Sequence, residues 1–211
     1  MKIQAVVFDF GGVMTTARAP DRIRPAVAAL GLSWDAVERG FAKYRNFMDA
    51  DAISMEEMYA HIFADSGVEV SPEAVAEIIK QDMSSFLYRN ERTLAWMKSL
   101  KARGFKIGIL TNMFSGFAPL FREHFADYVA LADAMVISGE AKMHKPQKRI
   151  YELLRGRIAL PAGALCFIDD VEANCEGARG DGWRAIRFED NAQTEAAFEA
   201  LLAQTGGEPA A

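Results

Sequence analysis

The chain has 211 residues, of which 51% are hydrophobic and 25% charged, a composition typical of a globular protein with one core and a smaller inserted domain. Its net charge of −5 argues against a general nucleic-acid-binding surface. No apolar stretch reaches the roughly 18 residues that span a bilayer, and the start of the chain does not read as a signal peptide. We therefore expect a cytoplasmic protein that binds neither nucleic acid nor membranes, with Cys166 and Cys175 as buried thiols.

The first predicted strand covers residues 2–9 and contains a run of small, β-branched and aromatic residues from Ala5 to Phe8. It ends at Asp9, and Gly11 and Gly12 follow, a pattern typical of a buried strand that meets a loop. An acid at the carboxyl end of a central parallel strand lies where open α/β sheets bind ligands. We therefore predict that Asp9 is a functional acid; the alternative is a turn residue that caps the next segment.

Residues 17–93 have helical periodicity and no convincing strand, which predicts an insertion of four α-helices. Three of these helices have clear start signals, at Ser33, at Ser54 and at Ser71-Pro72. Ser, Thr, Asp and Asn favour the position before a helix because their side chains accept hydrogen bonds from its first N–H groups.

After the insertion, helical segments alternate with strand-like runs, which predicts a parallel sheet with right-handed crossovers. The predicted strands are 105–112, 164–168 and 184–188, together with one or both of 128–131 and 134–137. The expected fold class is α/β, a Rossmann-like doubly wound parallel sheet with an inserted α-helical cap. We assign residues 1–16 and 94–205 to the core, 17–93 to the cap and 206–211 to a disordered tail.

Three predicted strands end in polar residues, and a fourth polar group precedes a predicted helix. These groups are Asp9, Thr111-Asn112, Asp169-Asp170 and His144-Lys145-Pro146. Strand ends of this kind converge on one crevice in a doubly wound sheet. Carboxylates suit magnesium, lysine suits phosphate, and successive backbone N–H groups in a glycine loop bind anions. The set predicts phosphoryl chemistry with a hard metal ion.

Four ordered motifs resemble those of the haloacid dehalogenase-like hydrolase superfamily. They are VVFDFGGVM, IGILTN, the lysine of KMHKPQKRIY, and CFIDDVEANCEGA, and the resemblance covers about residues 2–190. The helical insertion has the position of the type-one cap of that superfamily. Within it, FDFGGV, KPxxxIY and FIDDxxxN are most similar to the branch that includes the amino-terminal phosphatase domain of soluble epoxide hydrolase and bacterial sugar-1-phosphate phosphatases.

The resemblance implies a role for each motif residue. Asp9 would be the nucleophile that forms an aspartyl-phosphate, and Lys145 would neutralise charge on it. The expected magnesium ligands are Asp9, Asp170, the carbonyl of Gly11, and Asp169 as ligand or supporting partner. The expected contacts of the phosphoryl group are Gly11, Gly12, Thr111, Asn112 and Lys145. Asn174 would steady the loop after the fourth motif, and His144 is either a surrogate acid beside Lys145 or an ordinary surface histidine.

One position departs from the phosphatase pattern, which places a second Asp two residues after the nucleophile. Gly11 stands there, so the residue that protonates the leaving group is missing. Such a group contributes about 10²–10⁴ in rate. The chain is then a phosphatase for esters with good leaving groups, such as sugar 1-phosphates or acyl phosphates, or a weakly active domain that binds a phosphorylated ligand or a partner.

A third interpretation is a different reaction of the same superfamily. Dehalogenases of the superfamily need no metal, and Asp169-Asp170 argues against them. Phosphonate hydrolysis would need a cap lysine, and Lys43 and Lys80 fit ordinary helix surfaces. We expect a magnesium-dependent hydrolase that acts on a small phosphorylated metabolite as a monomer or homodimer. The arginines of the cap are expected to be solvated rather than to contact substrate; they include Arg18, Arg22, Arg24 and Arg45.

Overall fold

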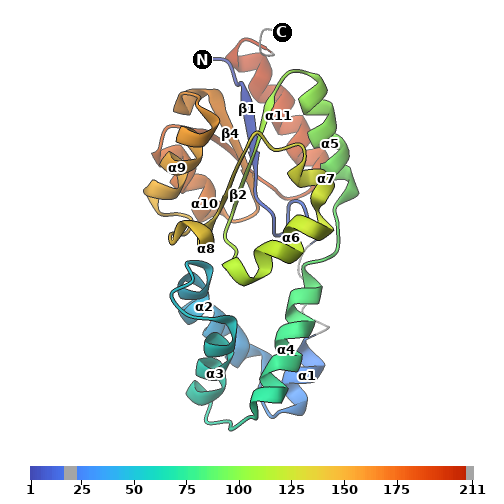
Figure 1. The fold of residues 1–211 in the computed structure, drawn as a ribbon. Coiled ribbons are helices and arrows are strands. Elements are labelled where there is room, and N and C mark those ends of the chain that lie inside the picture. The colour runs from blue at the N-terminus through green and yellow to red at the C-terminus, as the bar shows by residue number, and fades with distance from the viewer. Residues whose placement is uncertain (17–22, 208–211) are drawn as a thin grey trace.

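The structure is a computed structural model that describes residues 1–16 and 23–207. It consists of a β-sheet with helices on both faces and a group of helices that lies beyond one edge of this core (Figure 1). The N-terminus lies at the end of the molecule opposite these helices. This arrangement is the α/β core with a helical insertion that the sequence predicts.

Five parallel strands form the sheet in the order β3-β2-β1-β4-β5. They are β1 (Ala5–Phe8), β2 (Lys106–Thr111), β3 (Ala134–Ile137), β4 (Leu165–Asp169) and β5 (Arg184–Arg187). Strand β1 is central and lies between β2 and β4, which explains why all four of its residues are buried. Of the two short apolar runs, 134–137 is the strand, whereas 128–131 belongs to α7 (Ala126–Val129) and the turn after it.

The two faces of the sheet carry different helices because side chains alternate along each strand. Val6 and Phe8 pack with aromatic residues of the face covered by α5 (Glu91–Ala102), α6 (Ala118–His124), α7 and α11 (Asn191–Thr205). Val7 packs on the other face, against α9 (Lys148–Ile158) and α10 (Glu172–Gly180). The short α8 (Ser138–Ala141) follows β3.

The insertion has a hydrophobic core of its own. Its four α-helices in the described part of the chain are α1 (Arg24–Ala29), α2 (Trp34–Asp49), α3 (Met55–Asp65) and α4 (Pro72–Ser85). The predicted start signals are used: the hydroxyls of Ser33, Ser54 and Ser71 each accept a hydrogen bond from a backbone N–H of the first helical turn.

Two chain crossings join core and insertion, and they run side by side. Thr16 N–H donates to the carbonyl of Tyr88 at 2.8 Å, and Asn90 N–H donates to the carbonyl of Met14 at 2.8 Å. Asn90 also caps α5, which begins at Glu91, three residues before the expected start of the core segment at residue 94.

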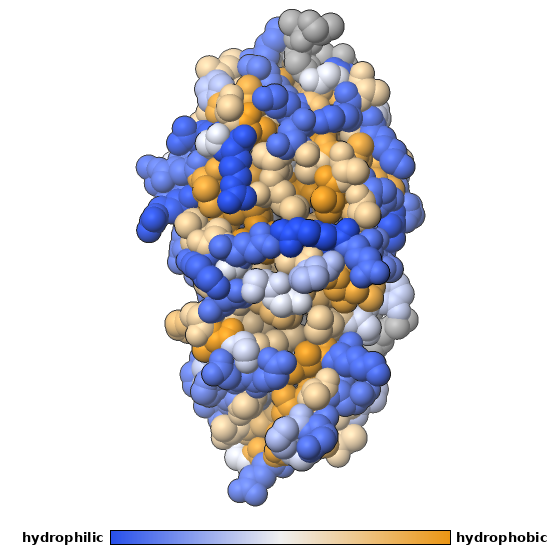
Figure 2. Space-filling view, viewed as in Figure 1, coloured by the Kyte–Doolittle hydropathy of each residue, from blue (hydrophilic) through white to orange (hydrophobic). Residues whose placement is uncertain are grey.

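The surface in Figure 2 mixes hydrophilic and hydrophobic residues over both the core and the insertion. None of the described helices is both long and apolar enough to cross a membrane. Helix α11 ends at Gly206, which has a φ of +94°, and the rest of the expected tail, 208–211, lies outside the described residues.

Candidate active site

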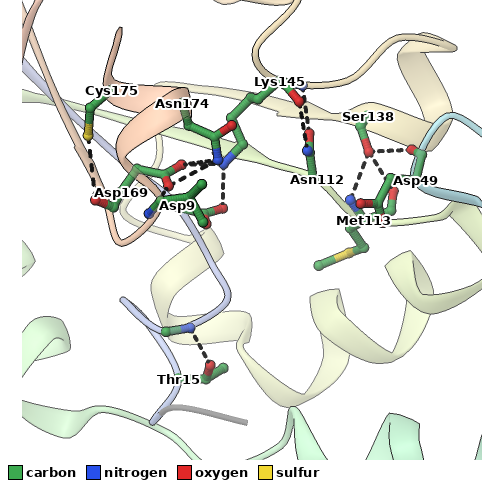
Figure 3. A network of polar contacts seen from close by, with 12 residues as sticks. Asp9, Thr15, Asp49, Asn112, Met113, Ser138, Lys145, Asp169, Asn174 and Cys175 are labelled. Atoms are coloured by element: carbon green, nitrogen blue, oxygen red, sulfur yellow. Dashed lines mark hydrogen bonds and ion pairs between the residues drawn. The ribbon is translucent and has the colours of Figure 1, made fainter. Parts of the chain in front are cut away.

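The polar strand ends meet at the carboxyl edge of the sheet. Asp9 follows β1, Asp169 ends the neighbouring β4, and the buried Lys145 lies between them in the loop before α9. Its Nζ is 2.8 Å from Asp9 Oδ1 and 2.6 Å from Asp169 Oδ2 (Figure 3). The structure therefore brings together the first, third and fourth motifs around one ammonium group.

Asp169 is fully buried and accepts hydrogen bonds at both oxygens. Val171 N–H donates to Oδ1 at 2.8 Å, and the Asn174 amide donates to Oδ1 and Oδ2 at 3.0 and 3.1 Å. Lys145 Nζ donates to Oδ2. Buried carboxylates need such partners, and these fix both the loop after β4 and the position of the lysine.

Asp170 faces the glycine loop after Asp9. A Cβ on Gly12 would lie 2.6 Å from Asp170 Oδ2, and Gly12 has a φ of +78°, so glycine is required here. Gly12 N–H donates to Thr15 Oγ1 at 3.0 Å (Figure 3). Gly11 differs, because a Cβ on it would meet nothing within 4 Å. The position where the second acid of the phosphatase pattern would stand is therefore open.

The carboxylates form a cluster that fits a divalent cation. One oxygen from each of Asp9, Asp169 and Asp170 lies within 4.8 Å of the others. Asp9 Oδ1 is buried and, apart from its ion pair with Lys145, has no hydrogen-bond partner among the described residues. Hard oxygen donors with negative charge are what magnesium prefers, so this set of oxygens fits that ion.

Burial raises the pKa of Asp9 to about 7 from its ordinary 3.8; Lys145 opposes this, and the charges of Asp169 and Asp170 add to it. Burial also raises the pKa of Asp170, and the negative charge of Asp169 raises it further. Burial disfavours the charged form of Lys145, but Asp169 and Asp9 outweigh it and hold the pKa of the ammonium above its usual range. Lys145 is therefore a permanent cation and not a base.

Asn112 holds the backbone of Lys145 from both sides. Its Nδ2 donates to the Lys145 carbonyl at 3.1 Å, and the Lys145 N–H donates to its Oδ1 at 2.8 Å. Thr111 is buried at the end of β2. His144 places Nδ1 2.9 Å from the Lys145 carbonyl and Nε2 3.0 Å from Gln147 Nε2, so its ring is engaged within its own loop. The roles of these three residues toward a substrate stay predictions.

A cavity of about 530 Å³ lies between the core and the insertion. Its lining from the core includes Asp9, Gly11, Gly12, Asn112, Lys145, Asp170 and Asn174. The insertion contributes Phe41, Arg45, Met48 and Asp49 from α2, which share a helical face by their spacing. Asp82, Met83 and Phe86 come from the end of α4.

Arg45, which the sequence suggests is solvated, lines this cavity with its side chain partly exposed. The i, i+3, i+4 spacing of α2 carries the signal, but it does not say which face of the helix turns to the core. Arg18 and Arg22 lie outside the described residues, and Arg24 is exposed over the Trp34 ring. Lys43 is an exposed partner of Asp65 at 2.7 Å, and neither it nor Lys80 lines the cavity, which disfavours a Schiff-base mechanism.

Comparison with known proteins agrees with the site. The family model of haloacid dehalogenase-like hydrolases matches residues 3–180, and the chain belongs to this family of enzymes. A phosphatase of Mycobacterium tuberculosis is 27% identical over 92% of this chain and 91% of its own length.

Solved structures share the fold. A HAD family enzyme from Bacteroides thetaiotaomicron has a TM-score of 0.69 at 18% identity, over 94% of this chain and 99% of that one. A second structure of that enzyme, in complex with magnesium and inorganic phosphate, has a TM-score of 0.68 at 19% identity, over 90% and 98% of the two chains. Magnesium is thus the metal bound in a structure of this fold.

Proposed function

We propose that the protein is a magnesium-dependent phosphatase that hydrolyses a small phosphate monoester through an aspartyl-phosphate on Asp9. The observation that carries the proposal is the buried Lys145 ammonium, 2.8 Å from the Asp9 carboxylate at the end of a cavity. The phosphatase name of the mycobacterial relative and the magnesium and phosphate in the Bacteroides structure support it.

Asp9, Asp170 and the carbonyl of Gly11 would hold magnesium, which supplies positive charge toward the phosphoryl oxygens when bound. Asp9 attacks phosphorus, the bond to the leaving oxygen breaks, and that oxygen keeps the electron pair. Lys145 offsets the charge that develops on the transferring group. Water then attacks the aspartyl-phosphate, Asp9 departs as a carboxylate, and the protons of the water leave with inorganic phosphate.

The remaining residues would position these groups. The Gly11 N–H, the Thr111 hydroxyl and the second amide N–H of Asn112 would contact phosphoryl oxygens. The Gly12 N–H, which donates to Thr15 Oγ1, would join them only by exchanging that bond. Asp169 and Asn174 hold Lys145 in place through the hydrogen bonds described above. His144 would have a structural role in the loop that carries Lys145.

The open space at Gly11 favours substrates with good leaving groups, such as sugar 1-phosphates, because no acid stands beside the leaving oxygen there. The motif resemblance to the epoxide hydrolase and sugar-1-phosphate phosphatase branch supports the same choice. The alternative is a weakly active domain that binds a phosphorylated ligand or partner, favoured by the same missing acid.

The test is phosphate release from p-nitrophenyl phosphate and acetyl phosphate. We expect turnover with magnesium, loss of turnover with EDTA, and a loss of at least about 10³-fold in Asp9→Asn. Asp65→Asn, which alters an exposed pair within the insertion, is the matched control and should keep wild-type rates. If the wild type releases no phosphate from a broad panel of esters, the binding alternative is favoured instead.

A further inference from the structure

Among the described residues that line the cavity, Arg45 is the cation that the proposed reaction does not use. It lies on α2 and lines the same cavity as Asp9 and Lys145. Asp9, Asp49 and Asp82 line the same cavity, and Asp49 forms an ion pair with Arg45 at 3.1 Å. Burial disfavours its charge, yet these carboxylates keep its pKa above the ordinary value, so it is always cationic.

Among the described residues, only Asp49 forms hydrogen bonds with the Arg45 guanidinium. Nε donates to Asp49 Oδ1 and Oδ2 at 3.2 and 3.1 Å, and Cζ lies 6.0 Å from the centre of the Phe86 ring. No described residue accepts a hydrogen bond from Nη1 or Nη2. The Arg45 side chain is 36% exposed, and the side chain of its partner Asp49 is 3% exposed. Two parallel N–H groups are therefore available to a ligand.

The position of Arg45 is tied to the core. The backbone carbonyl of Asp49 accepts a hydrogen bond from Ser138 Oγ, and Ser138 Oγ in turn accepts from the Met113 N–H at 2.7 Å (Figure 3). Met113 lines the cavity one residue after Asn112. The contact joins the end of α2, one helical turn after Arg45, to the polar strand ends of the core.

None of the described carboxyl groups that line the cavity is an unpaired acid beside Asp9. Asp49 is bound by Arg45, and Asp82 is buried and accepts from the Tyr59 hydroxyl at 2.7 Å. Asp170 belongs to the cluster that fits a metal. A leaving group at this site would depart without receiving a proton, and a fixed cation is then what stabilises it.

We propose that Arg45 binds the carboxylate leaving group of an acyl phosphate with an apolar acyl group, an inference that rests on the proposed function. A planar guanidinium binds the two oxygens of a carboxylate with two parallel N–H groups, a fit that a lysine or a neutral donor does not reproduce. The cavity that Arg45 lines also has an apolar part, which suits such a chain: Phe41, Met48, Met83, Phe86, Phe114 and Phe117.

The step balances without an acid. Asp9 forms a bond to phosphorus, the phosphorus–oxygen bond to the acyl group breaks, and its electron pair stays on the carboxylate. That carboxylate leaves unprotonated on Arg45, which keeps its charge throughout. The aspartyl-phosphate is then hydrolysed as described above.

The experiment compares benzoyl phosphate with phenyl phosphate, which share a ring but release a carboxylate and a phenolate. We expect Arg45→Ala to lower kcat/KM about 10²-fold for benzoyl phosphate and less than about tenfold for phenyl phosphate. Arg45→Lys should recover only part of the loss, because lysine restores the positive charge but not the two parallel N–H groups. The control is Arg39→Ala, an exposed arginine on the same helix that does not line the cavity, and it should match the wild type.

Binding of benzoate, followed by calorimetry in the presence of magnesium and inorganic phosphate, tests the same contact without turnover. We expect it to weaken at least tenfold in Arg45→Ala and to stay unchanged in Arg39→Ala. Equal losses on both esters, or unchanged benzoate binding in Arg45→Ala, would overturn the inference while leaving the phosphatase intact. A wild type that binds benzoate through Arg45 but hydrolyses no ester would instead overturn the proposed reaction.

Discussion

Two adjacent glycines in the first motif carry opposite constraints. Gly12 is required, because its positive φ and the 2.6 Å approach of Asp170 Oδ2 leave no room for a side chain. Gly11 has an ordinary φ and open space beyond its Cα. The backbone at residue 11 would therefore accept a side chain, so its conformation does not explain why the expected acid is absent.

We expect Gly11→Asp to be tolerated and to raise kcat/KM for poor leaving groups such as phenyl phosphate by about tenfold or more, because it returns a general acid. Gly11→Asn, which fills the same space without an acid, should show no gain, and Gly12→Ala should lose activity through strain and the clash with Asp170. Steady-state kinetics on all three variants checks this. A gain in Gly11→Asn equal to that in Gly11→Asp would mean that the acid is not responsible.

Lys145 supports stability as well as chemistry. It is the cation between two buried carboxylates, and Asp169 has no exposed surface. We expect Lys145→Met to lower the free energy of unfolding by about 3–5 kcal/mol in EDTA, because removing one partner leaves buried charge uncompensated. Lys148→Met, which breaks an exposed pair with Glu152, should cost less than about 1 kcal/mol. Urea denaturation measures both, and a similar cost for the two variants would contradict the argument.

At the scale of the elements, the turn from α2 to α3 connects the insertion to the core through polar contacts. Asp51, at a φ of 53°, places Oδ1 2.8 Å from the Ser115 N–H and Oδ2 2.9 Å from Lys142 Nζ. A Cβ on Gly139 would lie 2.5 Å from Asp51 Oδ1, so this glycine allows the turn to approach the core. Together with the bond from Ser138 to Asp49, these contacts hold the insertion against the core beside the cavity.

We expect Asp51→Ala to loosen the insertion, with a cost of about 1–3 kcal/mol in docking because hydrogen bonds to a charged group are lost. The amide of Ser115 should exchange its hydrogen faster, and KM should rise more than kcat falls. Asp65→Ala, which removes an exposed pair inside the insertion, is the control. Unchanged exchange at Ser115 would show that Asp51 does not hold the two parts together.

At the scale of the whole molecule, the carboxylate cluster makes the free energy of unfolding depend on pH when metal is absent. The pKa of Asp9 rises from 3.8 to about 7 on folding, chiefly through burial, so the folded state binds the extra proton between these values. Its contribution to stability is full below about pH 4 and is lost as the pH rises through 7. Asp170 shifts in the same direction.

We therefore expect the Tm of the protein in EDTA to fall between pH 5 and 8, and we expect Asp9→Asn to flatten that dependence. Magnesium should raise the Tm most at pH 8, where the carboxylates are ionised, because a ligand of the native state stabilises it by mass action. Scanning calorimetry with and without the metal checks both. A Tm in EDTA that rises from pH 5 to 8 would contradict the argument.

The fold, and the polar residues that the structure gathers at one edge of the sheet, could be predicted from sequence because most of their signals are local. The run from Ala5 to Phe8 is apolar on both faces, the serine caps are a few residues from what they bind, and strand ends of a parallel sheet share one edge. The short run 128–131 was ambiguous because a helical turn and a short strand have the same apolar content.

The sequence by itself determined the order of the elements, the acid at the end of the central strand and the absence of a partner acid at Gly11, since these depend on neighbours along the chain. Only the tertiary structure decided that Asn112 holds the Lys145 backbone and that Arg45 turns into the cavity. These contacts join residues far apart in sequence, and their distances are set by how the insertion packs against the sheet, which no local pattern encodes.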